Sequence, residues 1–382
     1  MDIVLAFGII LIISALSCKT AGKIGMPTLV GFILIGIFIG NWYEFEDMAF
    51  VSQICNFALL FIVFTGGFQT PYHKAKPVLA MSSVLSIIGT ILTASLAGAF
   101  AYFVLGMDIR QAVLLGVIIS PTDVASVFSV LRSRQSELKN NLDSVLEIES
   151  GSNEPFAHML TLVAISWSIG APNVPLIILL EIVIGVLSGI ILSKVGQFLV
   201  NWLNVEIDGV YGILLCGIAF TIYGVASQFG GSGFIAVYIG GIIMGNGKLV
   251  YKGSLSRFYS AISILMQTLL FIVLGILCVP ASILAVMGSG LIFALFLIFV
   301  ARPAVIFALM KPFKRPMNEI GLISWGGFRG TASIVFATHL LSEGLPYAEY
   351  IFSFVFFVCM LSVIIQSSFI IPLARKLRLT DD

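Results

Sequence analysis

This chain of 382 residues carries very little charge. Lysine and arginine together number 20 and aspartate and glutamate 19, so only 10% of the residues are charged, whereas 59% are hydrophobic. The mean hydropathy is correspondingly high, at +1.10. A water-soluble protein of this length could not bury so much apolar surface in one core. The composition therefore excludes a soluble protein and predicts one that lies in a membrane.

Cysteine pairs and large basic clusters are also missing. The cysteines stand singly in or beside apolar runs, without CxxC spacing, at positions 18, 55, 216, 278 and 359. They predict small packing residues rather than disulfides, and we expect neither a cofactor nor a resident metal. The net charge is only +1, and short loops account for the basic residues, so no nucleic-acid partner is expected. No polar linker interrupts the apolar runs, which argues against a soluble domain.

What the sequence does contain is a succession of apolar segments, and a membrane-spanning helix needs roughly 20 such residues. Thirteen segments are predicted, at 3–18, 27–42, 51–70, 78–104, 110–131, 145–169, 174–200, 209–227, 232–247, 258–280, 283–310, 318–342 and 349–373. The first lacks a basic leader and a convincing cleavage site, so it is interpreted as a retained helix rather than a signal peptide.

Positive charge alternates along the chain. Of the 20 lysines and arginines, 17 follow the odd-numbered segments or lie near their ends, whereas the even-numbered gaps carry mainly acidic residues. Basic loops stay in the cytoplasm. The pattern therefore predicts an outer N-terminus and a cytoplasmic C-terminus.

An odd number of spans permits two six-helix halves of opposite orientation, 3–169 and 209–373, joined by a linking helix at 174–200. Transporters built from such inverted repeats have broken helices at corresponding positions of the halves. The fifth segment of each half contains residues that interrupt a helix. Pro121 removes a helical hydrogen bond from 110–131, and three glycines between 326 and 330 weaken 318–342. We expect an all-α polytopic protein of about 13 transmembrane helices, in which discontinuous helices five and twelve cross.

Ionisable side chains within apolar segments are the strongest pointers to function, because each is costly in hydrocarbon, by at least about 2.5 kcal/mol. Asp123 lies in the first break. Ser150, Glu154 and His158 are spaced four apart and share one helix face, with Asn153 beside them.

Hard monovalent cations prefer oxygen ligands. Asp123, Glu154, Ser150, Asn153 and the Thr122 backbone offer such a set. Because a carboxylate can bind a proton instead, the two ions would compete for one site. The alternative is polar packing or ion pairing without a transport role, which is the favoured interpretation for Glu149.

These motifs resemble those of the cation–proton antiporter superfamily, specifically the NhaP-like members of its first family, including members assigned to potassium–proton exchange. The resemblance covers nearly the whole chain. The motifs that carry it are Pro27, Gly31, Gly36 and Gly40, then SPTD at 120–123, ESGSNEP at 149–155, Arg302-Pro303, and WGGFRG at 325–330.

The resemblance implies a homodimer in a bacterial inner (plasma) membrane, with its scaffold at 3–70 and 209–280. If one carboxylate alternates between a proton and a cation while Glu149 stays paired, the exchange is expected to be electroneutral. It also implies a core at 78–169 and 283–373 that moves like an elevator. Carried onto this chain, Asp123 and Glu154 would bind the cation and the proton, assisted by Thr122, Ser150 and Asn153. Glu149 and Arg329 would form a structural ion pair, Arg302 is a second possible partner, and His158 is a possible accessory residue.

Two departures from the family pattern leave the choice among Na⁺, K⁺ and Li⁺ open. Glu154 stands where relatives commonly have aspartate, and Thr65-Gly66-Gly67 lacks an acid that many relatives carry. Two other functions remain as alternatives. A cation channel would use the same oxygens. An intramembrane serine protease would use Ser232, within Gly230–Gly233, with His339 as its base.

Overall fold

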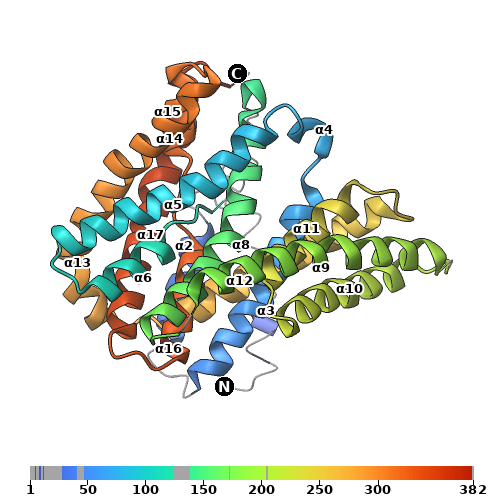
Figure 1. Ribbon diagram of the computed structural model, residues 1–382, viewed down its shortest axis with the longest axis horizontal. Coiled ribbons are helices and arrows are strands. Elements are labelled where there is room, and N and C mark those ends of the chain that lie inside the picture. The colour runs from blue at the N-terminus through green and yellow to red at the C-terminus, as the bar shows by residue number, and fades with distance from the viewer. Residues whose placement is uncertain are drawn as a thin grey trace.

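The computed structural model describes residues 28–40, 47–123, 138–171, 173–203 and 205–380, together with the single positions 5, 8, 9 and 12. For residues 28–30 and 74 it describes the backbone alone. Within these ranges the regular structure is helical, and an isolated antiparallel bridge joins Leu138 to Thr380 (Figure 1).

Each predicted segment from 27–42 onward overlaps a described helix. The segment at 3–18, apart from single positions, and residues 124–131 of the fifth segment lie outside the described residues. The helices are α2 (Thr28–Gly40), α3 (Met48–Gln69), α4 (Tyr72–Ala75), α5 (Leu79–Phe103), α6 (Ile109–Ile119), α8 (Leu142–Ser168), α9 (Val174–Trp202), α10 (Asp208–Gln228), α11 (Gly233–Asn246), α12 (Lys252–Ile276), α13 (Pro280–Phe296), α14 (Arg302–Met310), α15 (Met317–Trp325), α16 (Thr331–Ser342) and α17 (Ala348–Lys376). Among the described residues, seven helices are long and apolar enough to cross a membrane, and four shorter helices are also apolar. The prediction of an all-helical membrane protein is confirmed.

The helices form two groups that meet at α8 and α16. Helices α9, α10 and α11 are labelled on one side of Figure 1 and α12 near its middle, whereas α5, α6, α13, α14, α15 and α17 lie toward the other side. Helix α8 contacts α9, α11 and α3, and α16 contacts α3 and α12. The residues that carry the ionisable side chains of α8 are therefore enclosed by both groups.

Glycine allows α3 and α11 to approach closely. A Cβ on Gly67 would lie 2.5 Å from the carbonyl oxygen of Tyr238, and one on Gly241 would lie 2.6 Å from that of Phe64. Neither distance accommodates a side chain, so the two backbones pack directly against each other. This contact holds α11 close enough to α8 for the Ser152 hydroxyl to donate a hydrogen bond to the Tyr238 hydroxyl, at 3.1 Å.

The predicted span at 283–310 contains a local change of helical register. Residues Leu297–Ala301 form a π-helical segment, and the Arg302 N–H donates to the Leu297 carbonyl five residues earlier. Pro303 follows and has no N–H to continue the ordinary pattern. A π-bulge shifts the direction of the side chains that follow it, and here it immediately precedes the buried Arg302.

The predicted interruption of 318–342 is confirmed, because α15 ends at Trp325 and α16 begins at Thr331. Helix α17 satisfies the backbone that this break exposes. The Gln366 side-chain amide donates to the Trp325 carbonyl at 2.8 Å, and the Ser362 hydroxyl accepts from the Arg329 N–H at 2.9 Å. At the other predicted interruption, α6 ends at Ile119 and residues 120–123 are non-helical, whereas the remainder of that segment, 124–131, lies outside the described residues.

Candidate functional site

The two interrupted segments bond directly to each other. The Asp123 N–H donates to the Phe328 carbonyl at 2.9 Å. The Arg329 guanidinium donates from Nη1 to the carbonyls of Ser120, at 2.5 Å, and Pro121, at 3.0 Å. Carbonyls at a helix end need partners when they are buried. Arg329 supplies them at the end of α6, so it holds the two breaks together.

The Asp123 carboxylate lies at the beginning of α16. The Thr331 N–H donates to Asp123 Oδ2 at 3.4 Å, and the N-terminal end of a helix favours negative charge. Gly330 precedes this helix, and a Cβ built on it would lie 1.9 Å from the same oxygen. The absence of a side chain at residue 330 therefore makes room for the carboxylate.

We expect Gly330→Ala to lose most cation–proton exchange, because the added methyl group would displace the Asp123 carboxylate. Gly217→Ala on α10 is the matched control, since no atom lies within 4 Å of its added Cβ. Initial exchange rates in proteoliposomes and thermal unfolding in detergent would be measured for both. If Gly330→Ala exchanges as fast as the parent protein, the close approach of Asp123 and residue 330 is not needed for activity.

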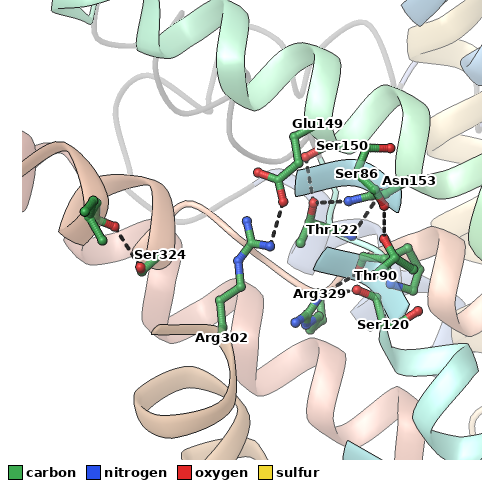
Figure 2. A network of polar contacts seen from close by, with 12 residues as sticks. Ser86, Thr90, Ser120, Thr122, Glu149, Ser150, Asn153, Arg302, Ser324 and Arg329 are labelled. Carbon is green, nitrogen blue, oxygen red and sulfur yellow. Dashed lines mark hydrogen bonds and ion pairs between the residues drawn. The ribbon is translucent and has the colours of Figure 1, made fainter. Parts of the chain in front are cut away.

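Helix α8 meets the first break through three polar side chains (Figure 2). The hydroxyl oxygens of Thr122 and Ser150 lie 2.7 Å apart, and the Asn153 amide donates to Thr122 Oγ1 at 2.8 Å. The Thr122 N–H donates in turn to Asn153 Oδ1 at 3.3 Å. The structure therefore brings Thr122, Ser150 and Asn153 together, and these contacts fix Thr122 beside Asp123.

Glu154 lies one residue beyond Asn153 and is 6% exposed. Because Asn153 bonds to Thr122, the residue before Asp123, the buried carboxyls of Glu154 and Asp123 belong to the same polar cluster. Within the described ranges no hydrogen bond or ion pair holds the Glu154 carboxylate, unlike that of Glu149. Two neighbouring carboxylates repel each other unless a proton or a cation lies with them. A pair of buried carboxylates such as Asp123 and Glu154 has the chemistry that binding of either ion requires.

The expected ion pair between Glu149 and Arg329 is not the one that the structure contains. The Glu149 carboxylate lies 2.6 Å from Arg302 Nη1, and both side chains are buried (Figure 2). Arg329 instead bonds to the carbonyls of Ser120 and Pro121. The reason is geometric: Arg302 follows the π-helical segment and extends toward α8, whereas the backbone of the first break engages Arg329.

Hydroxyl groups on α5 were not anticipated from the sequence. Ser82, Ser86, Thr90 and Thr93 are buried, and their spacing places them on one face of a helix that contacts α6 and α8. Thr90 donates to the Ser86 carbonyl, whereas the hydroxyls of Ser82, Ser86 and Thr93 have no hydrogen-bond partner among the described residues. Hydroxyl residues repeating every three to four positions within the apolar segment 78–104 could have identified this face.

Ser362 and Gln366 on α17 were missed as well. They lie four residues apart in an apolar helix, and the Ser362 hydroxyl donates to the Gln366 side-chain oxygen at 2.5 Å. Together they bind the backbone of the second break, as described above. Ser362 and Gln366 are isolated polar residues in an apolar segment, and this feature could have identified them from the sequence.

The protease alternative is contradicted by the positions of its two residues. The Ser232 hydroxyl caps α11 by accepting from the Ile235 N–H at 3.4 Å. His339 instead lies beside His158 and Ser52, with its two ring nitrogens 3.2 Å and 3.3 Å from their polar atoms. Ser232 therefore has no adjacent histidine base.

A helical membrane bundle in which the break between α15 and α16 meets the end of α6 beside buried carboxylates has the architecture of a secondary ion transporter. The family model described as "Sodium/hydrogen exchanger, transmembrane" matches residues 9–376. The chain therefore belongs to the sodium/hydrogen exchanger family, whose members are transporters rather than enzymes. The expected membership of the cation–proton antiporters is confirmed.

Relatives whose names specify different cations are similar to this chain. It is 32% identical to the K⁺/H⁺ antiporter NhaP of Alkalimonas amylolytica, over 98% of this chain and 67% of the relative. It is 31% identical to the K⁺/H⁺ antiporter NhaP2 of Shewanella oneidensis, over 95% of this chain and 65% of the relative, so it spans about two thirds of these proteins. The Na⁺/H⁺ antiporter NhaH of Halobacillus aidingensis is 25% identical, over 99% of this chain and 98% of that protein.

A solved structure supports the fold independently. The sodium proton antiporter MjNhaP1 of Methanocaldococcus jannaschii, determined at pH 8, superposes with a TM-score of 0.85 at 22% identity. The match covers 98% of each chain. At this identity the likeness establishes the shared fold.

Proposed function

We propose that this protein is a secondary antiporter that exchanges a monovalent cation, Na⁺ or K⁺, for protons. The observation that carries the proposal is that two buried carboxyl residues, Asp123 and Glu154, directly follow Thr122 and Asn153, which hydrogen-bond to each other where the first break meets α8. The names of the relatives, which are K⁺/H⁺ and Na⁺/H⁺ antiporters, support the same reaction.

In this proposal each residue of the site has a distinct task. Glu154 alternates between a proton and the cation, because no hydrogen bond or ion pair with a described residue ties its carboxylate to one state. Asp123 supplies the second carboxylate, held at the beginning of α16 by the Thr331 N–H. Thr122, Ser150 and Asn153 position the first break and offer oxygen atoms to a dehydrated cation.

The movement that we propose is of the elevator type. The core, 78–169 and 283–373, carries the crossed interrupted helices, whereas 3–70 and 209–280 form the scaffold of a homodimer embedded in lipid. The two six-helix halves are inverted repeats, with the N-terminus outside a bacterial inner membrane. The hydrogen bond between Ser152 of α8 and Tyr238 of α11 would break and re-form as the core moves.

Exchange in proteoliposomes tests the reaction directly. Na⁺, K⁺ and Li⁺ would be compared in one preparation under an imposed pH gradient. Saturable counterflow of one cation against protons supports the antiporter and identifies its substrate. Unitary currents without coupled proton movement would instead show a channel.

We expect the exchange to be electroneutral, because one carboxylate alternates between a proton and a monovalent cation while Glu149 stays paired with Arg302. A membrane potential of 100 mV changes the driving force for each net charge by about 2.3 kcal/mol. The equilibrium cation gradient would be measured with and without such a potential. A clear shift would show that Asp123 or another group carries an additional proton, since coupled acids titrate as a pair.

A further inference from the structure

Two histidines and a serine form a continuous polar chain that the proposed ion site does not use. His158 Nε2 on α8 lies 3.2 Å from His339 Nε2 on α16, and His339 Nδ1 lies 3.3 Å from Ser52 Oγ on α3. The buried His158 ring is enclosed by Phe234 of α11 and Phe336 of α16, with ring centroids 4.4 Å and 5.3 Å away. Apart from this chain, the surroundings of His158 are therefore mainly aromatic.

The geometry limits how many protons the two rings can hold. Only one hydrogen atom fits between the two facing Nε2 atoms, so one ring must donate and the other must accept. Both rings cannot be cationic together, because both Nε2 atoms would then carry a proton. The pair therefore holds at most one extra proton.

This arrangement permits transfer of one proton through the chain. A proton that binds His158 Nδ1 makes that ring cationic, and the ring then releases its Nε2 proton to His339 Nε2. His339 releases its Nδ1 proton to the Ser52 hydroxyl oxygen, which passes its own proton onward. Each ring gains one N–H bond and loses the other, so neither keeps a charge, and reversal of the tautomers resets the pair.

The His158 end of this polar series is close to the proposed ion site. His158 lies one helical turn beyond Glu154 on the same face of α8, and Cβ atoms at this spacing are about 6 Å apart. His158 Nδ1, where a proton would enter, is buried and has no hydrogen-bond partner in the described part of the chain. A buried polar atom without a hydrogen-bond partner costs about 1–3 kcal/mol of stability. An apolar side chain would fill this aromatic setting without that cost, so packing alone does not account for a histidine here.

The other end lies toward the beginning of α3 and the end of α16, and Ser52 itself is buried. His339 is in the last turn of α16 and is more exposed than His158, whereas Ser52 lies just beyond the first turn of α3. In Figure 1 the end of the bundle that carries α16 is opposite the C-terminus. The distribution of basic residues predicts that this end faces outward.

We propose that His158, His339 and Ser52 conduct protons between Glu154 and the outer face of the membrane. The proposal rests on the proposed function, because Glu154 is taken as the acid that loads and releases the proton. His158 and His339 are then proton-transfer residues for the exchange reaction, and Ser52 is the outermost described member of their route.

Several other titratable groups could influence the pH dependence of this route. They are Glu154 on α8, Tyr238 on α11, Tyr223 of α10 behind Phe234, and Asp47 and Glu343 at the ends of α3 and α16. Asp47 and Glu343 are exposed. The histidine variants below must therefore be compared over the same range of outer pH as the parent protein.

The test uses His158→Gln, His339→Gln and the double variant, with the full chain in oriented proteoliposomes. Glutamine keeps a hydrogen-bonding side chain but cannot relay a proton from one end to the other. We expect the maximal exchange rate to fall at least about tenfold at alkaline outer pH. The cation concentration that gives half the maximal rate should stay unchanged, because the ligands of the cation are intact.

Two further features identify a route in series. The double variant should be no slower than the slower single variant, because one break already interrupts the route. His73→Gln is the matched control and should exchange at the rate of the parent protein. His73 is exposed and lies in α4, away from His158, His339 and Ser52. In heavy water, the histidine variants should show a larger isotope effect on the rate than the parent.

Unchanged rates in both single variants would overturn the proposal. So would losses that multiply in the double variant, or a parallel change in the half-saturating cation concentration. If His158→Gln fails to fold, the same exchange measurements on His339→Gln and Ser52→Ala test the other two residues of the route. Loss of exchange in Glu154→Gln alongside normal histidine variants would remove the relay and keep the proposed function, whereas exchange persisting in Glu154→Gln would remove that function itself.

Discussion

Exchange by Glu154→Gln is expected to fall to the level of protein-free liposomes. Glutamine preserves the size of the side chain and one carbonyl oxygen, but it cannot bind and release a proton in the transport cycle. Because the Glu154 carboxylate forms no ion pair with a described residue, its replacement should leave the fold intact. The measurement is pH-driven uptake of Na⁺ and K⁺ by purified protein, together with thermal unfolding.

Glu181→Gln provides the matched control for this substitution. Glu181 is a partly exposed carboxyl on α9, remote in sequence from the interrupted segments, and its loss should leave exchange near the parent rate. Substantial pH-driven flux through Glu154→Gln would show that another group is the exchanging acid. Asp123 would then be the first candidate.

The largest loss of stability is expected for Arg302→Ala. The substitution would leave the fully buried Glu149 carboxylate without its cation, and a stranded buried charge lowers the free energy of unfolding by about 3–5 kcal/mol. We therefore expect a markedly lower melting temperature in detergent. A second substitution, Glu149→Gln, made in the same chain, should recover much of the loss because it removes the unpaired charge.

Arg315→Ala is the corresponding surface control. Arg315 is 25% exposed and lies 3.2 Å from Glu319, and pairs of this kind contribute only about 0–1 kcal/mol. If Arg302→Ala has the same melting temperature as the parent protein, the ion pair with Glu149 does not stabilise the fold. If Arg329→Ala causes the larger loss, the bonds from Arg329 to the Ser120 and Pro121 carbonyls matter more for folding than the buried ion pair.

The fold could be predicted in detail because membrane insertion imposes simple rules on the sequence. A helix must satisfy its own backbone in hydrocarbon, so span lengths follow from runs of apolar residues. Pro121 and the glycines at 326–330 predicted where two helices are interrupted, since both residue types weaken a helix locally. The described helices agree with these expectations at both positions.

The partners of buried side chains were much harder to predict. Spacing along α8 indicated that Ser150, Glu154 and His158 share a face, but spacing within one helix says nothing about which side chains of another helix reach it. Arg302 and Arg329 were both available to Glu149, and the π-helical segment before Arg302 decided between them. Such a local change of register depends on packing against neighbouring helices as well as on Pro303.

The sequence by itself therefore determined the helical membrane fold, the family and the polar residues of the two interrupted segments, because these follow from local hydropathy, backbone chemistry and motif. Only the tertiary structure decided that Glu149 pairs with Arg302, that Arg329 joins the two breaks, and that His158 meets His339. Each of these contacts joins residues more than 150 positions apart. Their formation depends on how whole helices pack, which no local pattern specifies.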